Sequence, residues 1–371
     1  LSVTLSSIFS FDYIGGLLGS IAFPLLLLPK LGFFATSFLC GLINISAAML
    51  IMWRFGDRVL KIKWYRTAAG VIAVFMIVGM IFSDNISMGI EGGLYRDKII
   101  YMEQTQYQKI VMTKHRDDVR LYIDGNCQFS TADEYRYHEA LVHVPMAELD
   151  SCESVLILGG GDGLAVREVL KYDNVEKIDL VDLDSEMIRI CSTNKNITSI
   201  NQDSLKSDKL SIHNEDAYEY LERSKEKYDL IIIDLPDPNS ESLNKLYSNV
   251  FYRMCGNCLN EKGVMVVQST SPYYATKAFW CINQTIASEG FNVKAYHLQV
   301  PAFGDWGFNM ASRQELTEDV SFDVETRYLS EENVSALFKF GKDEIAGDVD
   351  VNQLTKPVLM DYYNKAVEEW N

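Results

Sequence analysis

The sequence predicts an α/β fold in which a doubly wound sheet follows a small β layer and N-terminal transmembrane helices. Three observations carry this prediction. Short apolar segments alternate with helix-like segments from residue 151 onward, which is typical of a parallel sheet covered by helices. A glycine-rich turn, G-G-G-D-G, follows the first apolar segment. Before residue 85 the composition shifts to long uncharged segments, so the two parts of the chain are expected to lie in different solvents.

Three apolar segments near the N-terminus predict helices that cross a membrane. Residues 31–53 carry no charge and are long enough to span a bilayer core of ~30 Å. Tyr13–Pro29 and the shorter Thr67–Ser83 are the other two. A cleaved signal peptide would be a single segment with a small-residue cleavage site, which this region lacks. Because Leu1 already lies in an apolar stretch, we expect residues 1–85 to be a fragment of a longer membrane domain.

Residues 100–150 predict a small β layer and a linking helix. Tyr107–Thr113 and Arg120–Ile123 have the composition of strands, and turn-forming residues follow each of them. Glu134–Leu149 has a helix-like pattern. The layer therefore precedes the larger α/β domain.

From residue 151 to residue 313, strand and helix patterns alternate in chain order. The expected strands are Val155–Leu158, Lys177–Val181, Leu210–His213, Leu230–Ile233, Val264–Gln268, Asn292–Leu298 and Gly307–Ala311. The expected helices are Ala165–Lys171, Ser185–Thr193, Ala217–Arg223, Lys245–Cys258 and Ala275–Ser288. This alternation is typical of a Rossmann-like sheet of the methyltransferase type. Residues 314–371 form an acidic C-terminal extension with two expected short helices, for which the sequence indicates no function.

The turn after the first strand has the composition of a nucleotide-binding turn. Gly159 and Gly161 allow the backbone to turn tightly and to approach a ligand closely. Asp162 lies in the turn, and Asp182, about 20 residues further on, stands where such folds place the acid that binds a ribose hydroxyl. A glycine turn by itself often only packs a helix against a strand. Strand, turn, helix and distal acid together predict a nucleoside site.

Acidic residues follow the strands that are expected at the centre of the sheet. They are Asp162, Asp182, Asp184, Asp216, Asp234 and Asp237. Single aspartates at strand ends are often helix caps, but six at one edge of a sheet repel one another unless a cation neutralises them. The sequence therefore predicts a site for a cationic small molecule. A net charge of −17 argues against nucleic acid as a partner, because phosphate binding requires basic patches.

Cysteine and histidine spacing predicts neither disulfides nor a metal site. Seven cysteines are scattered along the chain and form no disulfide framework. Cys255 and Cys258 have the spacing of a redox or zinc pair, but there is no second pair, so free thiols are expected. Glu134, Glu139 and His143 are candidate metal ligands, yet their mixed helical spacing is more typical of a solvated face.

Several longer motifs occur in order between Tyr107 and Ala311. They read Y-Q-K-I, L-Y-I-D-G-N-C-Q-F-S-T-A-D-E-Y-R-Y-H-E, G-G-G-D-G, V-D-L-D, E-D, D-L-P-D-P and V-V-Q. In content, order and spacing this segment resembles the spermidine synthase family of polyamine aminopropyltransferases. The membrane segments, D-L-P-D-P and the long C-terminal tail are similar to a membrane-integrated bacterial subgroup of that family.

The resemblance implies aminopropyl transfer from decarboxylated S-adenosylmethionine to a diamine such as putrescine, giving spermidine and methylthioadenosine, with no tightly bound cofactor. An amine with a pKa of ~10 is protonated at neutral pH, so a base must accept its proton before it attacks. By its position in the matching motif, Asp234 would be that base. Tyr137 resembles the tyrosine that aligns the attacking nitrogen, and for His138 we expect a structural role.

The resemblance also implies which residues bind each substrate. Cosubstrate binding falls to Gln108, Gln128, Gly159, Gly161, Asp162, Asp182 and Asp216. Asp162 would bind the propylamine ammonium, Asp182 the ribose and Asp216 the adenine amino group. Acceptor binding falls to Asp237, Gln268 and Trp306. Asp237 would bind the far amine of the diamine.

Three departures from the family pattern concern the acceptor side. Leu164 replaces a second glycine and is expected to narrow the turn. Leu235 and Pro236 replace hydroxyl residues, and Pro236 has no N–H to donate. Phe303 replaces a tyrosine, which leaves Trp306 as an extra aromatic side chain. The identity of the acceptor amine is therefore not determined by the sequence.

Two alternative functions stay open. Another S-adenosylmethionine-dependent transferase, such as a methyltransferase, would use Asp182 and Asp216 equally well. The pair Asp234 and Asp237, together with Tyr137, favours aminopropyl transfer, because methyl transfer needs no paired carboxylates for a dication. A membrane-coupled sensor of polyamines or nucleosides would not need the base and its tyrosine.

The charge pattern conflicts with the expected location of the catalytic domain. Residues 54–66 hold five basic side chains, so the positive-inside rule places them in the cytoplasm. If Thr67–Ser83 crossed the membrane, the catalytic domain would lie outside. A nucleotide cosubstrate and reduced thiols favour the cytoplasm, so we expect a multi-pass protein of the inner membrane with a cytoplasmic catalytic domain, in which this short segment does not cross. The expected partners are a cationic diamine, the lipid bilayer and further copies of the chain.

Overall fold

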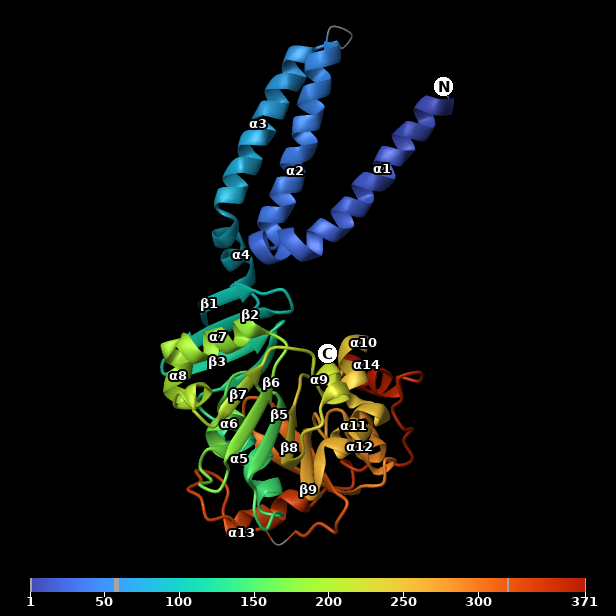
Figure 1. The fold of residues 1–371 in the computed structure, drawn as a ribbon. Coiled ribbons are helices and arrows are strands. Elements are labelled where there is room, and N and C mark those ends of the chain that lie inside the picture. The colour runs from blue at the N-terminus through green and yellow to red at the C-terminus, as the bar shows by residue number, and fades with distance from the viewer. Residues whose placement is uncertain (1, 57–59, 319, 371) are drawn as a thin grey trace. The chain divides into compact units, whose positions relative to one another are not determined.

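The computed structural model describes residues 2–56, 60–318 and 320–370. The chain forms two compact units, Leu1–Gln128 and Phe129–Asn371. Figure 1 shows that the first unit consists of long helices and a small sheet, whereas the second has a larger sheet with helices around it.

The first unit begins with helices. They are α1 (Ser2–Ala22), α2 (Leu28–Phe55), α3 (Ile62–Ile81) and α4 (Ser83–Glu91), with a π-helical turn (Phe23–Leu27) between α1 and α2. Among the described residues, three segments are long and apolar enough to cross a membrane: Phe9–Leu27, Lys30–Phe55 and Ile62–Ile81. The third begins before the expected Thr67 and has 20 residues, so it is longer than the sequence pattern indicated. Arg58 of the basic segment lies outside the described residues.

Helices α2 and α3 lie side by side, as Figure 1 shows, because small residues let them approach closely. A Cβ atom at Gly79 would come within 2.5 Å of the Phe38 ring, and one at Gly41 would lie 2.9 Å from the Met76 sulfur. Small residues at the contact are typical of helices that associate within a membrane.

A small antiparallel sheet follows the helices. Its strands are β1 (Lys98–Gln104), β2 (Lys109–His115), β3 (Asp118–Ile123) and β4 (Asn126–Ser130), in the order β1-β2-β3-β4. The predicted small β layer is therefore confirmed, and β1 and β4 are added to the two strands that were expected.

The second unit is built on a sheet with seven described strands. They are β5 (Ser154–Gly159), β6 (Lys177–Val181), β7 (Leu210–His213), β8 (Tyr228–Asp234), β9 (Leu259–Gln268), β10 (Asn292–Val300) and β11 (Gly304–Ser312). Their order is β10-β11-β9-β8-β5-β6-β7, with parallel pairs from β9 to β7 and an antiparallel hairpin, β10–β11, at one edge. The chain order reverses direction between β5 and β8. In sheets of this kind a ligand binds beyond the carboxyl ends of the strands at that reversal. The predicted doubly wound fold is confirmed.

Helices cover both faces of this sheet. They are α5 (Glu134–Met146), α6 (Leu164–Val169), α7 (Ser185–Thr193), α8 (Lys195–Asn201), α9 (Ala217–Arg223), α10 (Glu241–Asn244), α11 (Asn249–Cys258) and α12 (Thr276–Ala287). The expected helix Lys245–Cys258 is divided, because Ser248 is extended and its hydroxyl caps α11 by accepting the Phe251 N–H. The core between helices and sheet is apolar, with Tyr228 and Phe251 fully buried.

The C-terminal extension adds α13 (Glu331–Val334) and α14 (Val358–Trp370). Helix α14 has 13 residues, which is longer than the sequence indicated, and it packs against α12. Glu139 of α5 accepts the backbone N–H groups of Arg327, Tyr328 and Leu329 at 2.6–2.9 Å. One buried carboxylate therefore anchors the first part of the extension to the body of the unit.

Candidate active site

Close contacts in the turn between β5 and α6 leave no room for side chains at two of its glycines. Gly159 has a φ of +82°, and a Cβ atom there would lie 2.1 Å from the Asp234 carbonyl oxygen. A Cβ atom at Gly161 would lie 2.5 Å from Oδ2 of Asp182. Leu164, which was expected to narrow the turn, is fully buried in α6. The two glycines therefore bring the ends of β5, β6 and β8 together.

Two aspartates of the glycine turn region are held by backbone N–H groups. Asp182 accepts from Gly161 at 3.0 Å and from Asp184 at 2.9 Å, and burial raises the pKa of its carboxyl to about 6. Asp162 is 8% exposed, its Oδ1 accepts from Leu164 at 2.8 Å, and burial raises its pKa as well. Such partly desolvated carboxylates are strong sites for a cationic or hydroxyl-bearing ligand.

Asp234, the last residue of β8, forms a short hydrogen bond across the sheet edge. The Tyr137 hydroxyl of α5 donates to its Oδ1 at 2.5 Å. Burial, with the nearby Asp162 charge, raises the pKa of Asp234 to about 6. Burial and the Asp234 charge also raise the pKa of Tyr137 well above its usual value, so the phenol stays protonated and donates. A carboxylate with a raised pKa is a better general base than an exposed aspartate.

A second cluster of polar side chains surrounds Asp237, just beyond β8. Gln268 at the end of β9 donates from Nε2 to Asp237 Oδ1 at 3.4 Å, and the Tyr363 hydroxyl of α14 donates to Oδ2 at 2.9 Å. Tyr247 also accepts from Gln268 at 2.7 Å and donates to the carbonyl oxygens of Leu235 and Pro236, both at 3.1 Å. Sequence reasoning placed Asp237 and Gln268 in the site but missed Tyr247 and Tyr363.

Asp216 has a cation as its partner. Its Oδ1 caps α9 by accepting the Tyr218 N–H at 2.8 Å, and Lys245 donates to its Oδ2 at 2.6 Å. Lys245 also lies over the Tyr218 ring at 5.7 Å. Nothing in the sequence indicated this lysine. Asp216 follows β7, whereas Lys245 comes after β8, and the fold brings the two together.

The other predicted site residues are placed as follows. Trp306 of β11 is half-buried with its ring 5.2 Å from that of Phe303, and its indole N–H has no partner among the described residues. Phe303 in turn packs edge-on against Tyr137 at 6.0 Å. Gln108 and Gln128 belong to the first unit, where the Gln128 amide donates to the Asn126 carbonyl at 3.2 Å.

Comparison with known proteins identifies the family. Residues 134–323 match the profile of the Spermine/spermidine synthase domain. A polyamine aminopropyltransferase of Oceanobacillus iheyensis is 44% identical over 364 residues, which are 97% of this chain and 71% of the relative. The chain belongs to the spermine/spermidine synthase family. A polyamine aminopropyltransferase of Leptospira interrogans is 40% identical over 366 residues, 99% of this chain and 73% of the relative.

Solved structures of the family have the same fold. A spermidine synthase in complex with the transition-state analogue AdoDATO has a TM-score of 0.63 and 30% identity, covering 67% of this chain and 88% of its own. The spermidine synthase of Thermotoga maritima has a TM-score of 0.61 and 29% identity, covering 67% of this chain and 87% of its own. The family and enzyme class that the motifs predicted are confirmed.

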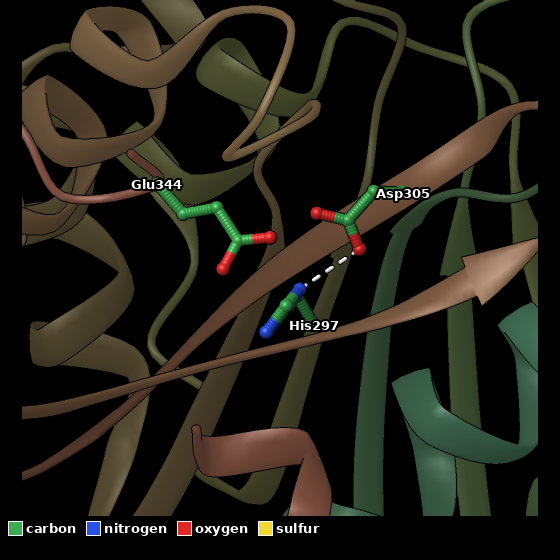
Figure 2. Close-up of side chains that lie close together, drawn as sticks. All are labelled: His297, Asp305 and Glu344. Carbon is green, nitrogen blue, oxygen red and sulfur yellow. Dashed lines mark hydrogen bonds and ion pairs between the residues drawn. The ribbon is translucent and has the colours of Figure 1, made fainter. Parts of the chain in front are cut away.

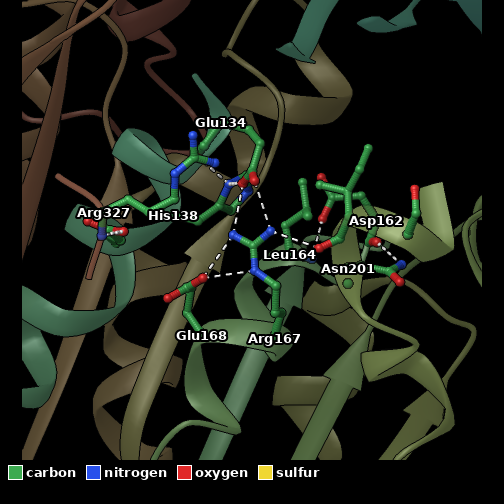
Figure 3. A network of polar contacts seen from close by, with 12 residues as sticks. Glu134, His138, Asp162, Leu164, Arg167, Glu168, Asn201 and Arg327 are labelled. Carbon is green, nitrogen blue, oxygen red and sulfur yellow. Dashed lines mark hydrogen bonds and ion pairs between the residues drawn. The ribbon is translucent and has the colours of Figure 1, made fainter. Parts of the chain in front are cut away.

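Behind the site of this family member, a buried ionic network joins α5 to α6 (Figure 3). The Arg167 guanidinium donates to both oxygens of Glu134 at 2.8 and 2.9 Å and to Glu168 at 2.8 Å. Burial lowers the pKa of His138, but its hydrogen bond to Glu134 and the charge of Asp162 outweigh this and raise it to about 8. His138 is therefore a cation beside the carboxylates, and its Nδ1 hydrogen-bonds to Glu134 one turn earlier on α5.

The three candidate metal ligands of the sequence are separated in this network. Glu134 binds Arg167, whereas His143 contacts Glu168 at 2.8 Å and the Tyr172 hydroxyl at 2.9 Å. Glu139 binds backbone N–H groups of the extension. These partners explain why the side chains are buried on α5 and do not form the solvated face that their spacing indicated.

A different cluster, His297, Asp305 and Glu344, has ligand atoms within 4.8 Å of one another (Figure 2). His297 Nδ1 lies 2.8 Å from Asp305, and Nε2 lies 2.9 Å from the Lys339 carbonyl oxygen. Both partners are acceptors, so both ring nitrogens donate. Burial lowers the pKa of His297, and the Asp305 hydrogen bond more than offsets this. An imidazolium offers no lone pair to a metal, so His297 and Asp305 form an ion pair within the β10–β11 hairpin, and the Lys339 carbonyl oxygen links His297 to the extension.

Proposed function

We propose that the chain transfers an aminopropyl group from decarboxylated S-adenosylmethionine to a diamine such as putrescine, giving spermidine and methylthioadenosine. Its relatives carry the name polyamine aminopropyltransferase, and a structural neighbour binds a transition-state analogue. The observation that carries the proposal is the Tyr137 hydroxyl donating to the partly desolvated Asp234 at 2.5 Å, in a row of carboxylates at the sheet edge. A direct assay for methylthioadenosine and spermidine tests it.

Each residue of the site has its own role in the reaction. The amine nitrogen bonds to the terminal carbon of the aminopropyl group while the carbon–sulfur bond breaks, and the electron pair of that bond stays on sulfur. The proton that the amine loses passes to Asp234, and Tyr137 orients this carboxylate. Asp237 and Gln268 bind the far ammonium of the diamine, with Trp306 along its chain.

On the cosubstrate side, the carboxylates act by charge and by hydrogen bonding. Asp162 binds the propylammonium group, and Asp182 accepts from the ribose hydroxyls. Asp216, which Lys245 also contacts, accepts from the adenine amino group. Gly159 and Gly161 let the turn approach Asp234 and Asp182 closely, which keeps these carboxylates together at the sheet edge.

Replacing Asp162 by Asn is expected to weaken the binding of decarboxylated S-adenosylmethionine by about 10–100-fold. This is the range for losing a hydrogen bond to a charged group. The amide oxygen still accepts the Leu164 N–H, so the turn is preserved. Methylthioadenosine, which has no ammonium group, should bind within about threefold of wild type, and calorimetry with both ligands measures the difference. Asp184→Asn, a helix-capping change nearby, is the matched control. Equal losses for the two ligands would make Asp162 a turn residue only.

We also propose that the protein is a multi-pass protein of the inner membrane with its catalytic unit in the cytoplasm, and that copies of the chain associate. The three apolar helices and the free thiols support the location, because reduced cysteines are typical of the cytoplasm. A C-terminal fluorescent protein that folds only in the cytoplasm should be bright, and a C-terminal phosphatase that is active only outside should be silent. A second pair of fusions within residues 60–66 reports whether α3 crosses. An active C-terminal phosphatase would refute the location.

A further inference from the structure

Helix α14 supplies a side chain to the acceptor end of the site. The Tyr363 hydroxyl donates to Asp237 Oδ2 at 2.9 Å, although the two residues are 126 positions apart in the chain. The other oxygen of Asp237 faces Gln268, whose amide is at the longer distance of 3.4 Å. Burial and the Asp237 charge raise the pKa of Tyr363 well above its usual value. The phenol is therefore protonated at neutral pH and donates to Asp237.

Buried contacts place α14 firmly against the site. Leu359 is fully buried in the core, and its N–H donates to the amide oxygen of Asn352 at 3.3 Å. Asn352 is itself fully buried and donates to the carbonyl oxygen of Tyr247 at 3.0 Å. Because Tyr247 also contacts Gln268, one chain of hydrogen bonds links α14 to the cluster of polar side chains around Asp237.

The end of α14 is held in the same region by aromatic contacts. Trp370 lies 5.7 Å from the Tyr273 ring and 4.9 Å from the Tyr274 ring, and both tyrosines follow Gln268 in the loop after β9. In that loop Thr270 has a φ of +59°, an unfavourable value for a β-branched residue. Helix α14 thus contacts the acceptor carboxylate and also the loop next to it.

We propose that Tyr363 is a positioning residue that sets which length of diamine the enzyme accepts. This inference rests on the proposed function, in which a diamine is held at both ends, by Asp234 and by Asp237. The distance between the two carboxylates then selects the number of methylene groups. The Tyr363 hydrogen bond, together with those of Gln268 and Thr270, orients the Asp237 carboxylate and so sets this distance.

The test is the Tyr363→Phe variant of the full chain, which keeps the ring and removes the hydroxyl. We compare kcat and KM for putrescine, 1,3-diaminopropane and cadaverine, with Tyr362→Phe as the matched control on the same helix. Tyr362 lies over Lys277 at 6.0 Å. For Tyr363→Phe we expect kcat/KM for putrescine to fall about tenfold, through KM, and preference for putrescine over cadaverine to fall at least about threefold. Saturating kcat, KM for the cosubstrate and the values of the control should stay within about twofold of wild type.

The outcomes separate this inference from the proposed function. If the wild-type chain transfers no aminopropyl group to any amine, both the proposed function and this inference are wrong. If the wild type is active and Tyr363→Phe keeps its KM and its preference, the inference alone is wrong. A uniform loss of kcat for all three amines, with a lowered melting temperature, would make Tyr363 a purely structural contact and also overturns the inference.

Discussion

Replacing Asp234 by Asn is expected to reduce kcat by about 10²–10⁴-fold, the usual contribution of a general base. The amide keeps the shape and can still accept the Tyr137 hydroxyl, which lies 2.5 Å away in the native site. It cannot accept the proton that the diamine must lose. Affinity for methylthioadenosine should change little, because Asp234 acts on the acceptor. Quenched assays of methylthioadenosine release at saturating substrates measure the effect, and retention of more than about a tenth of the wild-type rate would rule out this base.

The pH dependence provides a second measurement of the same assignment. Burial raises the pKa of Asp234 to about 6, so its charged form is present above that pH and is lost as the pH falls through it. Wild-type kcat should therefore decrease below pH ~6. Burial also raises the pKa of Asp237 to about 6, so Asp237→Asn is the control. That variant should keep the acid decrease in kcat, whereas the residual rate of Asp234→Asn should not show it.

The sequence was most informative where the candidate site residues lie in short, continuous motifs. The glycine turn and the aspartates at the strand ends are local patterns, and parallel strands bring their carboxyl ends to one edge. Asp162, Asp182 and Asp234 could therefore be placed near one another without a structure. For Asp216 the structure supports the helix-cap interpretation, because Oδ1 caps α9, and Oδ2 pairs with Lys245.

The residues that sequence reasoning missed depend on distant partners. Tyr363 reaches Asp237 across 126 positions, and Lys245 reaches Asp216 across 29. Nothing in the acidic extension marks Tyr363, because one tyrosine on an amphipathic helix is more often a packing residue. Its contact with Asp237 becomes visible only when α14 is seen in its place in the fold.

The same limitation explains why Glu134 and His143 were expected on a solvated face. Their spacing on α5 is visible in the sequence, but their partners Arg167, Glu168 and Tyr172 lie 25–33 positions away, in α6 and just after it. A carboxylate and a histidine on one helix fit either a solvated face or a buried network. The deciding factor is whether a cation comes from elsewhere in the fold.

That cation is Arg167, and replacing it by Met is expected to destabilise the second unit by about 3–5 kcal/mol. Glu134 and Glu168 are 3% and 2% exposed, so without the guanidinium they would stay buried with less compensation, and charged groups are costly in such surroundings. Met is close in length and keeps the apolar packing. The loss corresponds to a decrease in melting temperature of about 6–20 °C, which near-ultraviolet circular dichroism of the full chain in detergent detects.

Two further variants distinguish this network from an ordinary ion pair. Lys206 binds Asp203 at 2.7 Å on the surface, with side chains 58% and 56% exposed, so Lys206→Met should cost less than about 1 kcal/mol. The double variant Arg167→Met with Glu134→Gln should recover part of the lost stability, because it removes a buried charge together with its partner. A loss for Arg167→Met no larger than that of the surface control would show that Glu134 and Glu168 are stable without the guanidinium. In that case α5, which carries Tyr137 to Asp234, would be supported by its apolar contacts and by the hydrogen bonds of Glu139 and His143.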